Sequence, residues 1–170
     1  DTNAYVTLAD MARSTTAASI GTGMAYAFAR SPFLHANALR QIHRMAPGRV
    51  FCGLGSGTRR MNEDWFGMPA SRPLQRMTET VGALRAFLTA ENGQRIRYDG
   101  ELWRIDARVA APVLGSIDVP IVLGAFNRGM DFEHVGKMIS KDKKIAIGVI
   151  SHRTLQVERP EEIADLIRKA

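Results

Sequence analysis

Side chains capable of chemistry are concentrated in GLGSGTRRMNEDWFG, residues 53–67. Three glycines in five residues precede the arginine pair at 59–60 and an Asn-Glu-Asp cluster at 62–64. A glycine loop with backbone N–H groups aimed at an anion, beside basic side chains, can hold a phosphate. No lysine follows as in a P-loop, and the GxGxxG spacing is not matched. The competing interpretation is therefore a strand end packed under a turn.

The polar residues after this loop also have two interpretations each. The cluster at 62–64 can place a carboxylate beside a pocket for proton transfer, which requires a tuned pKa. It can equally cap a helix start ahead of Trp65 and Phe66, which we expect in the core. The arginine pair at 59–60 can bind an anionic cofactor tail or lie solvated at the surface.

The histidines and the single cysteine do not form a metal-ligand pattern. None of the four histidines pairs with another at i, i+4 around a carboxylate, and Cys52 has no cysteine partner, so we expect no zinc site. His35, near a helix start, either faces the mouth of a barrel or is a partly buried packing residue. A lone cysteine also fits a reducing compartment, and we expect a cytoplasmic protein.

Four short apolar runs predict the strands that position these residues. They cover residues 19–24, 49–55, 120–125 and 144–150, and each has glycine at or near its C-terminal end. Continuous runs of this length are typical of strands buried on both faces, as in a parallel sheet. A fifth segment, 95–105, alternates instead, and its Asp99-Gly100 pair predicts a hairpin with a two-residue turn.

Helical patterns separate the apolar runs. Helices are expected at 7–16, 31–45, 72–90 and 160–170, the second opening on Ser31-Pro32. Its apolar face is expected to hold Leu34, Ala38, Ile42 and Met45. Alternating strands and helices indicate an α/β fold with a parallel sheet. Four strands are too few for an eight-stranded barrel, which leaves a half barrel, an open sheet or part of a composite barrel.

The motifs IGTGM, RSPFLHANAL, GRVFCGLGSG, NEDWFG, YDG and PIVLGA follow one another in a specific order. In this order, residues 3–130 resemble the bacterial luciferase-like family of flavin- and deazaflavin-dependent oxidoreductases. The resemblance implies a TIM-barrel-like fold that binds FMN or a deazaflavin coenzyme at the C-terminal ends of its strands. It implies hydride transfer through that cofactor to or from a small-molecule substrate.

The resemblance also implies which residues contact the cofactor, although it assigns no catalytic residue. They follow two neighbouring strands and the loop after the second: Thr22, Gly23, Ser56, Gly57, Asn62 and Glu63. The family often has a strained bulge at the position of Thr22 and Gly23. The matching stretch omits two N-terminal strands and the later phosphate-holding loops of the family, so we expect an incomplete site.

From about residue 131 the chain resembles a different barrel. The segment IGVISHRTLQVERPEEIADLIRKA is similar to the C-terminal barrel of cobalamin-independent methionine synthase. The zinc-ligand cysteine that follows such a helix in that family is not in this sequence. Residues 1–130 hold 15 Arg and no Lys, whereas residues 131–170 hold 3 Arg and all 5 Lys. We interpret the chain as a single α/β domain, 1–170, that is a chimera of two barrel fragments, 1–130 and 131–170.

The composition excludes several other classes of function. The net charge is +6, but the arginines are scattered without interleaved aromatics, so nucleic-acid binding is not expected. No apolar run approaches the roughly 18 residues of a membrane span. The leading hypothesis is a luciferase-like oxidoreductase or monooxygenase scaffold, with self-association supplying missing strands as a homo-oligomer. The alternatives are a non-catalytic structural chimera and, more weakly, a methyltransferase fragment.

Overall fold

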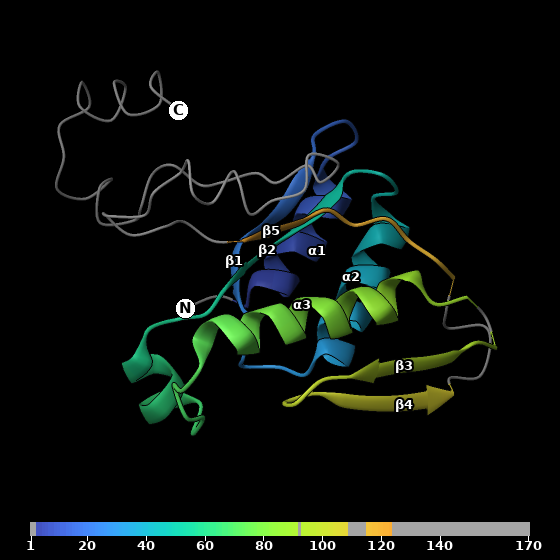
Figure 1. The fold of residues 1–170 in the computed structure, drawn as a ribbon. Coiled ribbons are helices and arrows are strands. Elements are labelled where there is room, and N and C mark those ends of the chain that lie inside the picture. The colour runs from blue at the N-terminus through green and yellow to red at the C-terminus, as the bar shows by residue number, and fades with distance from the viewer. Residues whose placement is uncertain (1–2, 92, 109–114, 124–170) are drawn as a thin grey trace, which may run out of the picture. The chain divides into compact units, whose positions relative to one another are not determined.

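The computed structural model describes residues 3–91, 93–108 and 115–123 (Figure 1). The chain divides into two units, Asp1–Ile121 and Val122–Ala170, and all but two of the described residues belong to the first. The predicted strand at 144–150, the predicted helix at 160–170 and the methionine-synthase-like segment at 131–170 lie outside the described residues. The division into domains proposed from the sequence therefore stays a prediction.

A three-stranded sheet lies at the centre of the first unit. Strand β1 (Ile20–Tyr26) pairs in parallel with β2 (Val50–Gly55), and β5 (Ile121–Leu123) follows on the other side of β2. The Cys52 amide donates to the Pro120 carbonyl at 2.9 Å, which joins β2 to the start of β5. The apolar runs at 19–24, 49–55 and 120–125 thus predicted the right strands and, for the first two, the right neighbours.

Three helices pack around this sheet, and their starts follow from capping residues. Helix α1 (Ala4–Ser14) begins after Asn3, whose side chain accepts from the Tyr5 amide, so it starts earlier than the predicted 7–16. Helix α2 (Pro32–Met45) begins after Ser31, whose hydroxyl accepts from the Leu34 amide. Helix α3 (Pro73–Thr89) also begins with proline at its first position. The last two match their predicted ranges closely.

The buried face of α2 differs from the predicted one. Leu34 is 52% exposed and Met45 is 41% exposed, so two of the four expected core residues face outward. Helix α2 lies between α1 and α3 with β2 beside it (Figure 1). It therefore buries a wide surface, which includes the polar side chains of His35 and Arg40 beside Leu39. The spacing rule failed because it assumed that polar residues mark the exposed side.

Arg40 is buried because it completes the end of α3. Its guanidinium donates to the carbonyls of Phe87 at 2.5 Å and Leu88 at 3.1 Å, and also to the Gly115 carbonyl. The last carbonyls of a helix have no partner within the helix, so a cation from a neighbouring helix can satisfy them. One side chain of α2 thereby fixes the C-terminus of α3 and the chain that leads towards β5.

The alternating segment forms the expected hairpin, but its turn is longer than predicted. Strands β3 (Arg95–Asp99) and β4 (Arg104–Arg108) pair antiparallel and leave a four-residue loop between them. A type I′ turn needs positive φ at both central residues, and neither Asp99 nor Gly100 has it. Instead, the carboxylate of Glu79 on α3 accepts from the amides of Leu102 at 2.7 Å and Trp103 at 3.1 Å. A tertiary contact therefore overrides the local turn signal.

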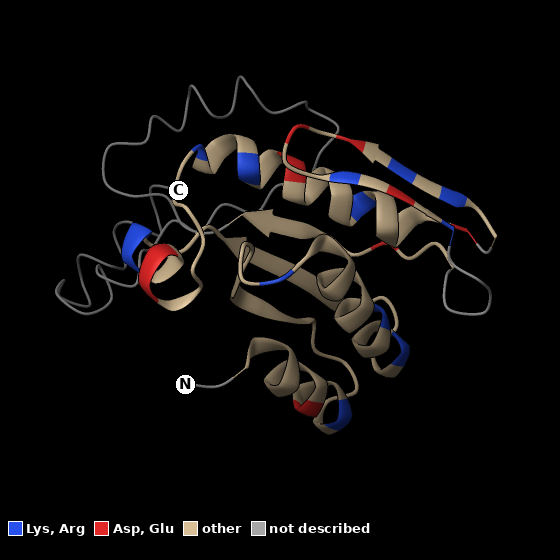
Figure 2. Cartoon of the chain, turned by 90° about the horizontal axis from the view of Figure 1, so that it is seen from below, with Lys and Arg blue, Asp and Glu red and all other residues tan. Residues whose placement is uncertain are grey.

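Charged side chains are kept away from the sheet. Figure 2 shows opposite charges alternating along the hairpin and gathered beside the short helix after β2, whereas β1 and β2 carry none. In the part of the chain that the structure describes, no helix is long and apolar enough to cross a bilayer. The candidate functional residues at 56–64 therefore follow strands that carry no charged side chains.

Candidate functional site

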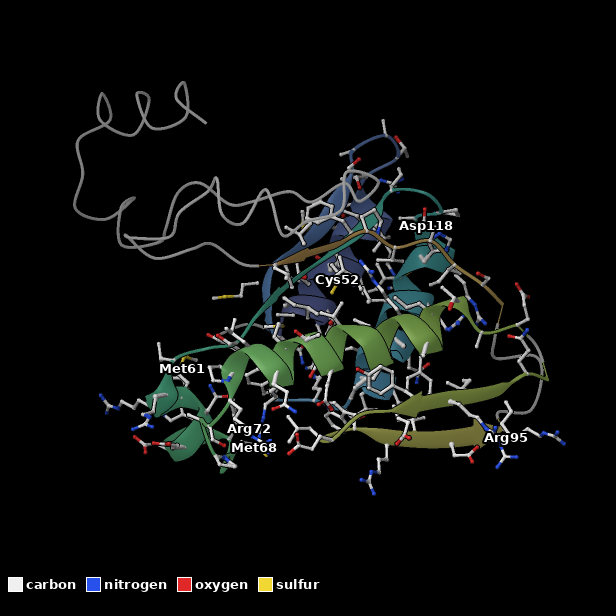
Figure 3. All side chains as sticks on the ribbon, viewed as in Figure 1. Cys52, Met61, Met68, Arg72, Arg95 and Asp118 are labelled. Atoms are coloured by element: carbon white, nitrogen blue, oxygen red, sulfur yellow. The ribbon has the colours of Figure 1, made fainter. Side chains whose placement is uncertain are left out.

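The ends of β1 and β2 lie together at one edge of the sheet, where the loop that carries Ser56 and Gly57 begins. Thr22 and Gly23 lie further back within β1, and Asn62 and Glu63 lie on the short helix after the loop. The amide of Ala27, just after β1, donates to the carbonyl of Gly55 at 2.9 Å, so both strands end at the same level. A loop at 56–58 then leads into a five-residue π-helix, Met61–Trp65, called η1 here. In Figure 3, Met61 lies in this short helix at the margin of the molecule, while Cys52 lies inside, among the helices.

Thr22 joins the two strands instead of pointing into open space. Its side chain is 3% exposed. Its hydroxyl donates to the Gly53 carbonyl at 2.8 Å and accepts from the Gly53 amide at 2.9 Å. The hydroxyl is thus occupied by the main chain of β2, and Thr22 can contribute to a site only by fixing the backbone around it.

The register of β1 shifts directly after Thr22. Thr22 is paired with Cys52, and the next paired residue, Ala25, faces Leu54, so Gly23 and Met24 together span the irregularity. A Cβ on Gly53 would collide with the carbonyl oxygens of Thr22 and Gly23. A bulged strand can approach its neighbour this closely only where the neighbour has no side chain.

Exposed side chains next to the bulge were not among the predicted site residues. Met24 is 50% exposed, and its thioether lies over Gly55, where a Cβ would collide with the sulfur. Tyr26 is 37% exposed, and its ring centroid is 5.5 Å from that of Phe66. Together they give the strand ends an apolar, polarisable surface suited to a planar ring. The available sequence signal was their position at the C-terminal end of a buried strand.

The loop after β2 is organised by Asn62. Its carboxamide nitrogen donates to the carbonyls of Ser56 and Thr58, both at 2.8 Å, which closes the loop around Gly57 at φ +70°. The side-chain oxygen Oδ1 is enclosed and has no hydrogen-bond partner among the described residues, and Asn62 is 3% exposed. A buried acceptor without a donor is destabilising until a donor arrives.

The neighbouring charged residues lie on the outer side of η1. Glu63 contacts Arg59 at 3.6 Å and Asp64 contacts Arg60 at 3.5 Å, and all four side chains are at least 44% exposed. Exposed pairs of this kind contribute little to stability. Trp65 is 62% exposed, so its predicted place in the core is wrong. The reason is that η1 is a single short turn with only Asn62 buried.

Beneath the strand ends lies a buried polar cluster that joins α1, α2 and β2. The Tyr5 hydroxyl is 2.6 Å from His35 Nδ1 and 3.8 Å from Cys52 Sγ, and His35 Nε2 is 3.2 Å from the Ala27 carbonyl. His35 has no exposed surface, so of its two sequence interpretations the structure supports packing. Because the Ala27 carbonyl can only accept, Nε2 carries the proton and Nδ1 accepts from Tyr5.

Burial sets the ionisation of this cluster. It lowers the pKa of His35, opposed by the hydrogen bond to Ala27 and assisted by the nearby charge of Arg30. It raises the pKa of Tyr5, to which Cys52 adds. It likewise raises the pKa of the Cys52 thiol. All three side chains are therefore neutral near pH 7, which suits a hydrogen-bonded joint.

Metal-ligating side chains do not gather within residues 3–91, 93–108 and 115–123. No group of three or more His, Cys, Asp or Glu residues in these ranges could hold an ion. The strand ends instead combine an apolar surface, an exposed backbone bulge and one unsatisfied acceptor.

The sequence of this chain matches a known protein family. Residues 2–132 match the family described as luciferase-like monooxygenase. The chain belongs to that family. The match confirms the resemblance to the luciferase-like family, while the boundary at 130 and the second resemblance stay predictions. The luciferase-like relatives are much longer than this chain.

Three relatives match parts of the chain at moderate identity. An uncharacterized protein of Mycobacterium tuberculosis is 38% identical over 93 residues, which are 54% of this chain and 27% of the relative. A 5,10-methylenetetrahydromethanopterin reductase of Methanolobus tindarius is 30% identical over 121 residues, 71% of this chain and 35% of the reductase. An F420-dependent hydroxymycolic acid dehydrogenase of Mycobacterium tuberculosis is 35% identical over 107 residues, 60% and 28% respectively. The chain thus spans about a third of their length.

Solved structures show the same fold at lower identity. An F420-dependent secondary alcohol dehydrogenase superposes with a TM-score of 0.65 at 18% identity, over 100% of this chain and 50% of its own. The oxygenating constituent of 3,6-diketocamphane monooxygenase from Pseudomonas putida, solved with FMN, gives 0.56 at 15% identity, over 72% and 37%. The expected cofactor class, FMN or a deazaflavin, is confirmed among these luciferase-like proteins.

Proposed function

We propose that this chain forms part of the cofactor-binding wall of a flavin- or deazaflavin-dependent oxidoreductase. The cofactor ring would lie at the C-terminal ends of β1 and β2, and the reaction would transfer a hydride to or from a small organic substrate. The observation that carries the proposal is the buried, unsatisfied Oδ1 of Asn62, whose carboxamide lies with the Tyr26 ring against Gly57, just after the end of β2. Membership of a family with F420-dependent relatives supports a cofactor of this class.

The six residues assigned from the sequence take different roles in this proposal. Gly23 leaves open space, because an added Cβ there would meet nothing within 4 Å. Ser56 and Gly57 present backbone groups from a loop that Asn62 holds in place. Asn62 also offers its free acceptor to a ring N–H or a hydroxyl. Thr22 fixes the bulge, and Glu63 lies at the outer rim with Arg59.

The chemistry expected of the bound cofactor is to accept or donate a hydride. The chain's own contribution is to orient the ring and exclude water. Met24 and Tyr26 supply an apolar surface for the ring. No described side chain at the edge combines burial with an ionised group, so this part of the wall positions rather than transfers protons.

Cofactor titration tests the proposal directly. We expect FMN or F420 to bind saturably, seen as fluorescence quenching and a shifted visible spectrum. Asn62→Ala should weaken binding about tenfold, the value of one lost hydrogen bond of about 1.4 kcal/mol. Glu63→Gln at the adjacent position is the matched control, with less than about a twofold change because its carboxylate is exposed. Absence of binding of both cofactors at about 1 mM, the limit of weak affinity, would refute the proposal.

The alternatives proposed from the sequence give a different result in the same experiment. A non-catalytic chimera of two barrel fragments would bind neither cofactor and would still unfold cooperatively. A methyltransferase fragment would instead bind Zn²⁺ tightly, which elemental analysis of the purified chain would detect. Neither alternative accounts for the unsatisfied acceptor of Asn62.

A further inference from the structure

The buried cluster beneath the site is connected to the site through one carbonyl group. His35 Nε2 holds the carbonyl of Ala27 at 3.2 Å, and the Ala27 amide in turn donates to the Gly55 carbonyl at 2.9 Å. Ala27 is therefore clamped on both sides where β1 ends and the loop to α2 begins. Gly55 is the last residue of β2, directly before the loop that Asn62 closes.

The Ala27 carbonyl, at one end of this cluster, fixes the direction of its hydrogen bonds. The Ala27 carbonyl accepts from Nε2, which leaves Nδ1 as an acceptor, and only the Tyr5 hydroxyl can serve it. The Tyr5 oxygen is then free to accept from the Cys52 thiol at 3.8 Å. A single donor-to-acceptor order thus leads from Cys52 on β2 to Tyr5 on α1, and another hydrogen bond leads from His35 on α2 to Ala27 at the end of β1.

We propose that His35 is a positioning residue for the cofactor site, acting through the Ala27 carbonyl on the ends of β1 and β2. This inference rests on the proposed function. It adds His35 of α2, which has no exposed surface of its own at the ends of β1 and β2. Its neutral Nε2–H form is the competent one. Protonation would put a second donor against Tyr5 and reverse the hydrogen-bond order.

Apart from the Ala27 carbonyl, whose hydrogen bond raises the pKa of His35, the groups that face His35 favour its neutral form. Tyr5 from α1 and Cys52 from β2 are uncharged near pH 7, and Arg30 from the loop after β1 brings a positive charge, with its guanidinium 5.0 Å from the centre of the Tyr5 ring. No described carboxylate contacts the ring to stabilise a cation. Without the hydroxyl of Tyr5, Nδ1 would lose its donor, and His35 would accept a proton more readily.

Two variants and one matched control test the role of His35. His35→Leu removes both hydrogen bonds, Tyr5→Phe removes only the donor to Nδ1, and His43→Leu alters a half-buried histidine of the same helix. In labelled protein, we expect the wild-type His35 ring to show the neutral Nε2–H tautomer by nitrogen NMR. Backbone amide signals of Ala27, Gly55 and Gly57 should move in His35→Leu and stay unchanged in His43→Leu.

Cofactor titration gives the second readout. FMN or F420 affinity should fall about fivefold in His35→Leu, which corresponds to about 1 kcal/mol for one hydrogen bond. In Tyr5→Phe, affinity should match wild type at pH 8 and decline towards pH 6, which a purely structural role would not produce. If wild type binds neither cofactor, the proposed function fails while the NMR signals still decide the inference. Equal amide shifts in His35→Leu and His43→Leu, or an Nδ1–H tautomer, would overturn it.

Discussion

A threonine hydroxyl and a missing side chain define the geometry of the site at the scale of single residues. Thr22 bonds to both the amide and the carbonyl of Gly53, and Gly53 has no room for a Cβ because two carbonyls of the bulge face it. The bulge is thus specified jointly by a residue on β1 and a residue on β2. Neither Thr22 nor Gly53 alone would indicate the bulge from the sequence.

Replacing Gly53 with alanine should therefore be costly. We expect Gly53→Ala to lower the free energy of unfolding by about 1–3 kcal/mol, the usual cost of forcing an extra methyl into a packed site. Gly23→Ala is the control: its φ is not positive and an added Cβ meets nothing within 4 Å. Urea denaturation of both variants checks the difference. Equal midpoints for the two would show that the bulge tolerates a side chain at 53.

The buried histidine makes stability depend on pH. Burial lowers the pKa of folded His35 below its unfolded value near 6.5, so the unfolded chain binds protons more readily. Its contribution is fully present above about pH 6.5 and is lost as the pH falls below that value, towards the lowered pKa of the folded state. Urea midpoints measured across this window should decline in wild type and stay flatter in His35→Leu. An identical slope in both proteins would assign the effect to other groups.

At the scale of elements, polar side chains decide how the helices are held. Arg40 is 6% exposed and carries three carbonyl contacts, two of them at the end of α3. Hydrophobic spacing predicted where α2 and α3 lie but not which face of α2 is buried. Periodicity counts apolar residues, whereas His35 and Arg40 are buried because each finds hydrogen-bond partners on other elements.

Removing the cation of Arg40 should loosen α3. Arg40→Met keeps an apolar stem of similar length but leaves the carbonyl of Phe87 without its donor, which should cost about 2 kcal/mol of unfolding free energy. Arg40→Lys should recover part of this, since one ammonium can reach fewer carbonyls. Arg44→Met, at an exposed position of the same helix, is the control. Thermal unfolding followed by circular dichroism gives the order of the four proteins.

Much of the site was accessible from the sequence, and the missing parts have clear reasons. The strands at 19–24 and 49–55 and the start of α2 were predicted, whereas the cofactor contacts of Gly23 and Gly57 stay a prediction. Met24 and Tyr26 were missed because exposed apolar residues on a buried strand resemble core. The longer hairpin loop was missed because Glu79, distant in sequence, supplies the contact that replaces a type I′ turn.

At the scale of the whole molecule, this chain spans about a third of the relatives it matches. In the described residues, β1 has a neighbour only on the β2 side, so one edge of the sheet has unpaired backbone groups. An open edge of a parallel sheet favours pairing with another strand. A second copy of this chain is the partner we propose, in keeping with a wall that is only part of a barrel.

Light scattering after size exclusion checks this proposal. We expect a mass that is a multiple of 18.7 kDa at micromolar concentration, falling towards the monomer on dilution. Cofactor should shift the equilibrium towards the larger species if the site is shared between copies. A constant 18.7 kDa monomer at every concentration, with or without FMN, would contradict self-association.

The attachment of the hairpin to α3 has a consequence for the order of folding. Tyr98 packs on Gly82, Trp103 donates to Thr80 and Glu79 holds the loop, all within residues 73–108. The sheet, by contrast, needs Cys52 to meet Pro120, a residue much farther along the chain. Closing a short loop loses less entropy than closing a long one. During synthesis, the segment that comprises α3 and the β3–β4 hairpin can therefore fold early, before β5 is available to complete the three-stranded sheet.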